Sequence, residues 1–331
     1  MNPSGRLWRP DNFYKSHILL NFIARRIASI TIVMAIVALT VFLMLRLVPG
    51  DPIAILAGDS ASQEQIDILR KSMGLDDPLP AQFVRWIVAV LGGDLGISIF
   101  SRAPVLSLIA ERLEPTISLT IVTLLVAVPL AVIAGITAAA KAGSLVDRCV
   151  MALSVLGFSV PGFVIGYLLI YVFAVNLKWL PVQGYAHFSD GFWPWLQRLI
   201  LPSITLGFAY IALISRMTRT AVLDVLSEDY IRTAKAKGVA PRQVLFRHAL
   251  KNAGVPIVTT IGIGVALLIG GAIITETVFN IPGVGRLVVD AIQKRDYPVI
   301  QGVTLLLSAV YVLVNLLIDL SYTLIDPRVR Y

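Results

Sequence analysis

Residues 116–140 read TISLTIVTLLVAVPLAVIAGITAAA, a stretch without a single charge and long enough to cross a lipid bilayer. A helix rises about 1.5 Å per residue and needs about 20 apolar residues to span the hydrocarbon core. Five more uncharged blocks of this kind occur, at 27–45, 149–176, 199–215, 253–275 and 299–318. Lipid offers no hydrogen-bond partner to the backbone, so each block is predicted to be a helix.

The composition of the whole chain agrees with a protein whose solvent is lipid. Of 331 residues, 57% are hydrophobic and only 15% are charged, whereas soluble domains carry about 25% charged residues. The single cysteine, Cys149, excludes an intrachain disulfide and is predicted to be a small packing residue. The histidines at positions 17, 187 and 248 have no zinc-site spacing. We therefore expect an all-α polytopic membrane protein with about six transmembrane helices.

The distribution of basic residues predicts the orientation of the chain in the membrane. With the N-terminus in the cytoplasm, 17 of the 28 Lys and Arg fall in the inside segments 1–26, 141–148, 216–252 and 319–331. The inside loop 216–252 has eight, against two and three in the outside loops 177–198 and 276–298. Positive residues favour the cytoplasmic side, so both termini are expected inside. The same rule accounts for the net charge of +8 without a nucleic-acid partner.

These assignments divide the chain into consecutive parts. The predicted parts are a cytoplasmic tail (1–26), a first transmembrane helix with an extracytoplasmic region (27–115), a core of five transmembrane helices (116–320) that includes the loop 216–252, and a cytoplasmic tail (321–331). The first block is too long for a cleaved signal peptide and is expected to remain as an anchor.

Local signals add detail to these parts. Helices are expected in the outer region at 63–73, capped by Ser62, and at 80–90. Kinks are expected at the prolines of the apolar blocks, and close helix packing at their glycines. The residues concerned are Pro129, Pro161, Pro202, Pro256, Gly262, Gly264, Gly270 and Gly271.

The loop 216–252 contains two short helices separated by a glycine. Ser227 is predicted to cap the first helix, and Gly238 to end it. Pro241 is a favourable first-turn residue for the second helix, which is expected to run to Lys251. Two interpretations are open on these features alone: an amphipathic surface helix that satisfies the charge rule, or a docking element for a soluble partner.

The stretch RTAKAKG at 232–238 resembles the Glu-Ala-Ala-x-x-x-Gly signature of ABC importer permeases. Arg232 and Thr233 replace the first two signature residues, and HALK at 248–251 stands where the family has Ile-x-Leu-Pro. Further motifs in the same order are similar to those of dipeptide and oligopeptide permeases: LVPGDP (47–52), LDDPL (75–79), GDLGIS (93–98), ETVFNIPGVG (276–285) and DPR (326–328). The resemblance covers roughly residues 20–331 and is closest to the permease type with a long outer region after its first span.

The resemblance implies the fold of a type I ABC importer permease in the bacterial inner membrane, with the first helix outside a five-helix core. It also implies these partners: a second related permease, two cytoplasmic ATP-binding subunits that use ATP and Mg²⁺, and an extracytoplasmic solute-binding protein. No cofactor is expected on this chain. The substrates expected are di- or oligopeptides, with nickel or glutathione as alternatives. The ATPase-coupling loop would use Asp229, Tyr230, Arg232, Thr233, Ala234, Gly238 and His248.

Several catalytic functions are excluded by missing motifs. The dipeptide Gly-Lys is absent, so the chain has no Walker A phosphate loop and is not expected to be an ATPase. Ser159 lacks the following glycine of a nucleophile elbow and has no histidine on any span to act as a base. Two other classes stay open: an ion-driven secondary transporter, which the charge-free blocks disfavour, and a membrane scaffold or receptor.

Overall fold

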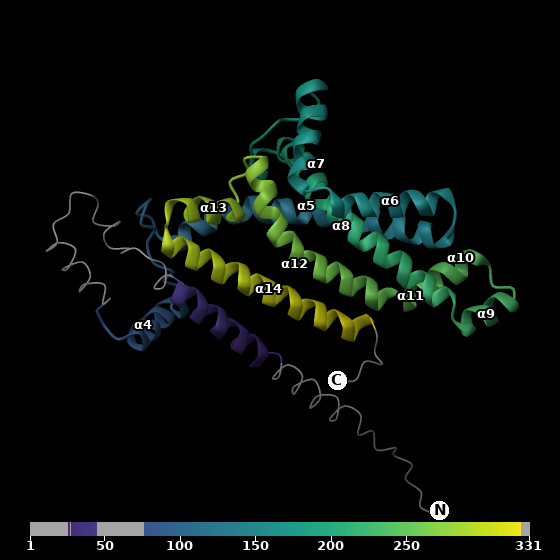
Figure 1. Cartoon of the computed structure of the whole chain (residues 1–331), viewed down its shortest axis with the longest axis horizontal. Coiled ribbons are helices and arrows are strands. Elements are labelled where there is room, and N and C mark those ends of the chain that lie inside the picture. The colour runs from purple at the N-terminus through teal and green to yellow at the C-terminus, as the bar shows by residue number, and fades with distance from the viewer. Residues whose placement is uncertain (1–25, 27, 45–75, 326–331) are drawn as a thin grey trace, which may run out of the picture.

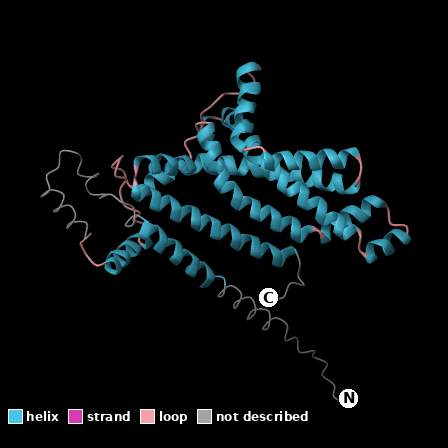
Figure 2. Cartoon of the chain, in the orientation of Figure 1, coloured by secondary structure: helices cyan, strands magenta, loops and turns pink. Residues whose placement is uncertain are grey.

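The structure is a computed structural model that describes residues 26, 28–44 and 76–325, with the side chains at 266–267 and 321–325 left aside. Within these residues every regular element is a helix (Figure 2), which confirms the predicted all-α class. An unlabelled first helix, Ala28–Met44, precedes the labelled ones. The helices that follow are α4 (Leu79–Leu91), α5 (Val105–Ala140), α6 (Leu145–Ser159), α7 (Gly162–Leu169), η1 (Ile170–Asn176), η2 (Phe188–Asp190), α8 (Phe192–Leu226), α9 (Asp229–Ala236), α10 (Pro241–Gln243), η3 (Val244–Ala249), α11 (Leu250–Asn252), α12 (Gly254–Val278), α13 (Val284–Lys294) and α14 (Tyr297–Ile325).

Each of the six predicted blocks coincides with a helix or a bent pair of helices. By length and composition α5, α8 and residues 297–320 of α14 can each cross a membrane. Two bent pairs can do the same: α6 with α7–η1, and the two halves of α12. The first helix is shorter, with 17 apolar-rich residues. The predicted helix at 80–90 is confirmed as α4, whereas the predicted helix at 63–73 lies outside the described residues.

The long helices lie side by side and define two ends of the bundle (Figure 1). We call the end that carries α9, α10 and α11 the α9 end, and the opposite end, with α4 and α13, the α13 end. The first helix runs between them beside α14: Arg26 forms an ion pair with Asp319 at 2.6 Å, and Val41 accepts a hydrogen bond from Gln301. Accordingly the first helix starts, and α14 finishes, toward the α9 end.

The kink predicted at Pro161, within the block 149–176, is a sharp bend. Helix α6 and the segment α7–η1 meet at 105°. Val160 is extended, with φ −94° and ψ 122°, directly before Pro161. Proline has no N–H to continue a helix and its ring disfavours helical geometry in the preceding residue. Pro129 and Pro202, in contrast, lie inside the unbroken helices α5 and α8.

Glycines allow the helices of the core to approach closely. A Cβ added at Gly264 would lie 1.8 Å from Tyr210 Cε2, and one added at Gly262 would lie 2.3 Å from Ile318. Gly271 is similarly tight against Leu206, at 2.8 Å. These three confirm the predicted close packing, but Gly270 does not, because nothing lies within 4 Å of its added Cβ. Cys149 also differs from the prediction: it is exposed on α6 rather than packed inside the chain.

Helices α5 and α8 pack tightly at Gly135, and we expect a larger residue there to disrupt the packing. A Cβ there would lie 2.6 Å from the backbone oxygen of Ser215 and 2.6 Å from Thr218 Cβ. Gly135→Ala should therefore destabilise the bundle by about 1–3 kcal/mol, the usual effect of overpacking. Thermal aggregation of the detergent-purified chain measures this, with Gly162→Ala as the control, since nothing lies within 4 Å of that position. Equal melting of the two variants would contradict the packing described.

Candidate coupling site

Helix α9 follows α8 after only two residues, Ser227 and Glu228. The predicted cap is wrong by one position: Glu228 is the N-cap residue, in extended conformation and without a side-chain cap bond. Helix α8 continues to Leu226, so Ser227 serves as its C-cap, and its hydroxyl donates to the carbonyl of Asp224 at 2.7 Å. Serine hydroxyls readily make such local bonds to backbone groups in place of capping the next helix.

The end of α9 is closed by Gly238, as predicted. Gly238 has φ +81°, a left-handed conformation that glycine adopts without strain. Its N–H donates to the carbonyl of Lys235 at 3.0 Å, and the N–H of Val239 donates to Ala234 at 3.2 Å. This pair of bonds is the Schellman motif, which satisfies the last carbonyls of a helix. The chain therefore turns sharply from α9 toward Pro241, the first residue of α10.

One side chain anchors α9 to the rest of the protein. Ile231 is completely buried, and it is the only residue of α9 that is buried. Beside it, the Tyr230 hydroxyl accepts a hydrogen bond of 2.7 Å from Asn252 Nδ2 on α11. Helix α9 also packs against η3. Sequence analysis did not include Ile231 or Asn252 in the site, although an isolated apolar residue in a polar helix was a usable signal.

The other predicted residues of α9 form its exposed face. The side chains of Asp229 and Arg232 are 94% and 74% exposed and form an i,i+3 ion pair at 3.2 Å. A surface pair of this kind contributes at most about 1 kcal/mol, so it leaves the face available to a partner. Thr233 is exposed and donates to the carbonyl of Asp229, while Ala234 is half-buried. The small side chains leave this surface flat.

The second helix of the loop is continuous from Pro241 to Asn252, as expected, but its middle is wider than an α-helix. Residues Val244–Ala249 form a π-helical segment, η3, between α10 and α11. Val244 and Ala249 point into the bundle and are buried. His248 lies half-buried in η3, on the segment that packs against α9. Helix α9 and η3, the segment that carries His248, therefore pack together, at the end of the bundle where Figure 1 shows α9, α10 and α11.

The sequence placed the carboxylate of Glu276 at the end of a span, whereas the structure places it inside the bundle. Glu276, near the end of α12, is completely buried. It accepts hydrogen bonds from Thr116 Oγ1 at 2.6 Å and from the N–H of Arg286 at 2.9 Å. Since Arg286 is in the first turn of α13, Glu276 caps that helix, where the helix dipole favours an anion. A Cβ on Gly283 would lie 2.2 Å from this carboxyl, which explains the glycine in the motif ETVFNIPGVG.

A second buried carboxylate closes the same end of the bundle. Asp296 is 4% exposed and accepts from the Ser98 hydroxyl and from the N–H groups of Ile99 and Phe100. These bonds fasten the loop after α4, with its motif GDLGIS, to the junction of α13 and α14. The α13 end is therefore held by buried carboxylates on backbone N–H groups, a feature that no block count can predict.

A polar cluster of α5 and the loop before α8 also lies toward the α13 end. Glu114 Oε2 lies 2.8 Å from His187 Nδ1, and Glu114 Oε1 accepts from the N–H of Phe188 at 2.9 Å. The Tyr185 hydroxyl donates to both Glu114 and Ser118. The hydrogen bond to Glu114 raises the pKa of His187 above its usual 6.5. The cluster is exposed, so its protonation follows the pH of the solvent on that side.

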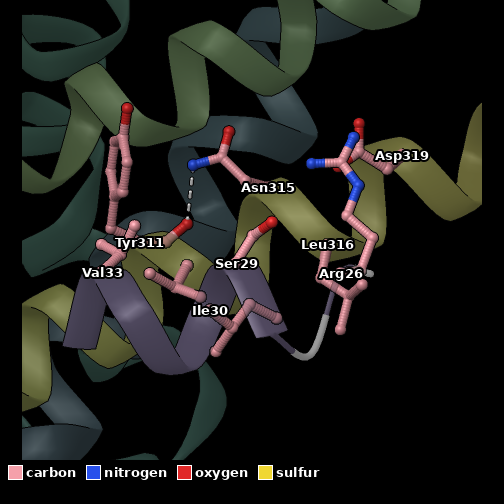
Figure 3. Close-up of a pocket in the computed structure, with 9 residues that line it drawn as sticks. Arg26, Ser29, Ile30, Val33, Tyr311, Asn315, Leu316 and Asp319 are labelled. Atoms are coloured by element: carbon pink, nitrogen blue, oxygen red, sulfur yellow. Dashed lines mark hydrogen bonds and ion pairs between the residues drawn. The ribbon is translucent and has the colours of Figure 1, made fainter. Parts of the chain in front are cut away.

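Between the first helix and α14 lies an open groove of about 160 Å³ (Figure 3). Its polar end holds Arg26 and Asp319, and its wall includes Asn315, which donates to the carbonyl of Tyr311. The remaining lining is mostly apolar. The groove lies apart from α9 and adds no residue to the coupling site. Among the described residues no group of three or more His, Cys, Asp or Glu could hold a metal ion.

The arrangement of these helices occurs in a solved ABC transporter. A chain of the MetNI methionine ABC transporter, crystallised in inward-facing conformations, superposes with a TM-score of 0.53 over 66% of this chain and 96% of its own length, at 19% identity. A second crystal form gives a TM-score of 0.51. The fold is therefore that of an ABC importer permease.

Sequence comparisons define the family. The family described as "Binding-protein-dependent transport system inner membrane component" matches residues 127–331, and its N-terminal component matches residues 19–120. The chain belongs to this family of inner-membrane permeases, which confirms the predicted class and location. A probable peptide ABC transporter permease of Sinorhizobium fredii is 56% identical over 94% of this chain and 99% of its own length. The glutathione transport system permease GsiC of Escherichia coli K12 is 44% identical over 95% and 100%.

We expect Ile231, the one buried residue of α9, to keep the whole helix folded against the bundle. Ile231→Ala removes a fully buried side chain, which usually costs about 2–5 kcal/mol. The loop 228–240 should then become sensitive to protease in detergent, while membrane insertion of the chain is unchanged. Lys235→Ala, on the exposed face of the same helix, is the matched control. Equal protection of both variants would show that Ile231 is not the anchor.

The contact between Glu114 and His187 should depend on pH in a defined direction. Because the pKa of His187 is raised, its contribution is fully present below pH 6.5 and is lost as the pH rises through the raised value. Glu114→Gln should return the pKa of His187 toward 6.5. Histidine ring NMR signals of the labelled chain, assigned with His187→Gln, measure this change. An unchanged titration in Glu114→Gln would contradict the contact.

Proposed function

We propose that this chain forms half of the translocation path of an ATP-driven importer and pairs with a second, related permease. Family membership makes it the membrane component of a binding-protein-dependent ABC system. The observation that carries the finer proposal is α9, a short helix with one buried anchor and an otherwise exposed, flat face. Such a helix suits docking into a cleft of a soluble subunit better than packing within its own chain.

The proposed orientation places α9 in the cytoplasm. The start of the first helix and the end of α14 lie toward the α9 end, on the same side of the bundle as the basic loop 216–252. Positive residues favour the cytoplasmic side, which supports the orientation with both termini inside. The α13 end then faces outward, where an extracytoplasmic solute-binding protein would deliver its cargo. The Glu114–His187 cluster would be exposed to the same compartment.

ATP hydrolysis is assigned to two partner subunits. The chain has no Gly-Lys dipeptide and so no Walker A loop, which supports a transport role without a nucleotide site of its own. ATP and Mg²⁺ would act on the partners, and their closure would reach this chain as a displacement of α9. Helix α9 can pass on that displacement in two ways: through Ser227 to α8, and through Ile231 and Tyr230 to η3 and α11. Alternating access would follow from the tilt of these helices.

The substrate proposed is a small peptide, di- or oligopeptide in size. The support is the name of the Sinorhizobium relative, a probable peptide permease, together with the peptide-permease motifs. Glutathione is the second candidate, because the relative GsiC belongs to a glutathione transport system. Nickel was a third candidate from motifs alone. Uptake of labelled dipeptide by cells that carry the whole system, with unlabelled glutathione or Ni²⁺ as competitor, separates the three.

The proposal is tested by co-purification and by substitutions at Gly238. The wild-type chain, expressed with the neighbouring genes, should copurify with a second permease and ATP-binding subunits. Gly238→Asp and Gly238→Asn should both abolish uptake without loss of membrane insertion. Asparagine tolerates the left-handed backbone, and none of the described residues lies within 4 Å of an added Cβ, so a loss in Gly238→Asn reflects a partner that approaches closely.

Three outcomes would count against the proposal. Recovery of the chain alone would show that it does not belong to an ATP-driven assembly. Normal uptake by Gly238→Asp would show that α9 is not the coupling contact. Loss in Gly238→Asp with normal uptake in Gly238→Asn would show that the added negative charge, and not close approach, is what matters at this position.

A further inference from the structure

A bidentate ion pair joins α6 and α8 near α9, and neither partner was singled out in the sequence. Asp147, in the first turn of α6, is 4% exposed. Its Oδ1 accepts from Arg219 Nε at 2.5 Å and its Oδ2 from Arg219 Nη2 at 2.8 Å. Arg219 is on α8, eight residues before Ser227, and thus about two turns from the start of the coupling loop.

The carboxylate is fixed from its own side as well. The N–H of Gly143 donates to Asp147 Oδ2 at 2.8 Å, and the Ser144 hydroxyl accepts from the N–H of Asp147. Gly143 has φ +80°, which lets the turn between α5 and α6 fold back over the carboxylate. A bidentate arginine fork on a carboxylate held in this way fixes the relative direction of two helices as well as their distance.

Helix α8 is therefore held on two different sides near the α9 end. On the apolar side, Val222 and Ala221 are buried against Ala249 and Ile257 of the η3–α12 segment. On the polar side, Asp147 joins α8 to α6. The close contact at Gly135 adds α5 to the same body. The apolar contacts have no direction and can slide, whereas the ion pair cannot shift without breaking two charge-assisted bonds.

We propose that Asp147 and Arg219 are positioning residues for energy coupling: they tie α6 to the part of α8 that carries α9, so that a displacement of α9 moves α6 with it. This inference rests on the proposed function, in which α9 receives the motion of an ATPase. Helix α6 leads directly to the bend at Val160–Pro161 and to α7, where a Cβ added at Gly166 would lie 3.3 Å from the side chains of Phe279 and Val278 at the end of α12. The ion pair thus connects the α9 end of the bundle, where the motion of the ATPase would arrive, to a helix that reaches the α13 end.

The test uses the complete assembly in proteoliposomes, with ATP hydrolysis and solute uptake measured on the same preparation. Asp147→Asn removes the charge attraction and leaves Arg219 without its anion. Arg219→Lys keeps the charge balance but replaces the fork with a single contact. Both variants should assemble with their partners and hydrolyse ATP. The solute moved per ATP should fall roughly tenfold in Asp147→Asn, within the 5–150-fold range of ordinary coupling free energies, and less in Arg219→Lys.

Two further variants separate coupling from simple stability. Ser154→Ala is the matched control, because Ser154 also joins α6 to α8, through a neutral contact of 3.0 Å to Ser215, and Ser215 retains its bond to the carbonyl of Ala212. Solute moved per ATP should be unchanged in it. The double variant Asp147→Asn with Arg219→Gln should lose no more than Asp147→Asn alone, because residues that act through each other are not additive.

The results that overturn the inference are distinct from those that overturn the function. If the wild type imports solute and both single variants move as much per ATP, the pair has no part in coupling. If neither single variant assembles while Ser154→Ala does, the pair stabilises the fold only, and the inference is equally wrong. If the wild-type chain recovers no ATP-binding subunit, the proposed function itself fails.

Discussion

The rest of the structure depends on the absence of water around the backbone of the spanning segments. A peptide group in hydrocarbon must find its hydrogen-bond partner within the chain, and only a helix provides this for a single segment. The spanning segments are therefore long helices, such as α5 and α8. Because lipid is as apolar as their side chains, these helices are held together by tight packing and not by the hydrophobic effect. Helices in such a medium associate through close backbone approach, which is why glycines at 135, 262 and 264 lie against neighbouring residues.

The same constraint decides where charges can be used. Each buried carboxylate is satisfied locally: Glu276 by a helix terminus and a hydroxyl, Asp296 by loop N–H groups, and Asp147 by an arginine fork. The first two lie toward the α13 end and fasten connections there, whereas the third lies toward the α9 end and joins two long helices. The exposed charges of α9, such as Asp229 and Arg232, lie at the surface. The protein thus uses its buried carboxylates at the ends of the bundle, where each one fixes a junction.

Sequence reasoning reached the class, the helix blocks, the family and the glycine that ends α9, because these depend on local signals: hydropathy, turn chemistry and ordered motifs. It placed the start of α5 too late because charged residues such as Glu111 and Arg112 interrupt hydropathy without interrupting the helix. It expected a kink at Pro161 but not a bend as large as 105°, since the effect of a proline depends on the neighbours that cover the freed carbonyls. The partners of Asp147 and Glu276 lie 72 and 160 residues away along the chain, and a single sequence does not reveal such pairs.

The buried carboxylate of Glu276 also sets an order on the making of the protein. Its hydroxyl partner on α5 is synthesised long before it, but the N–H of Arg286 comes ten residues later. While α12 enters the membrane, the carboxylate therefore lacks the backbone N–H that later holds its second oxygen, and an incompletely satisfied carboxylate in lipid is costly. A nascent chain that stopped after α12 would keep this charge exposed among apolar helices. Completion of α13 thus stabilises the inserted chain. A product truncated after α12 would keep the incompletely satisfied carboxylate of Glu276, which quality control would recognise.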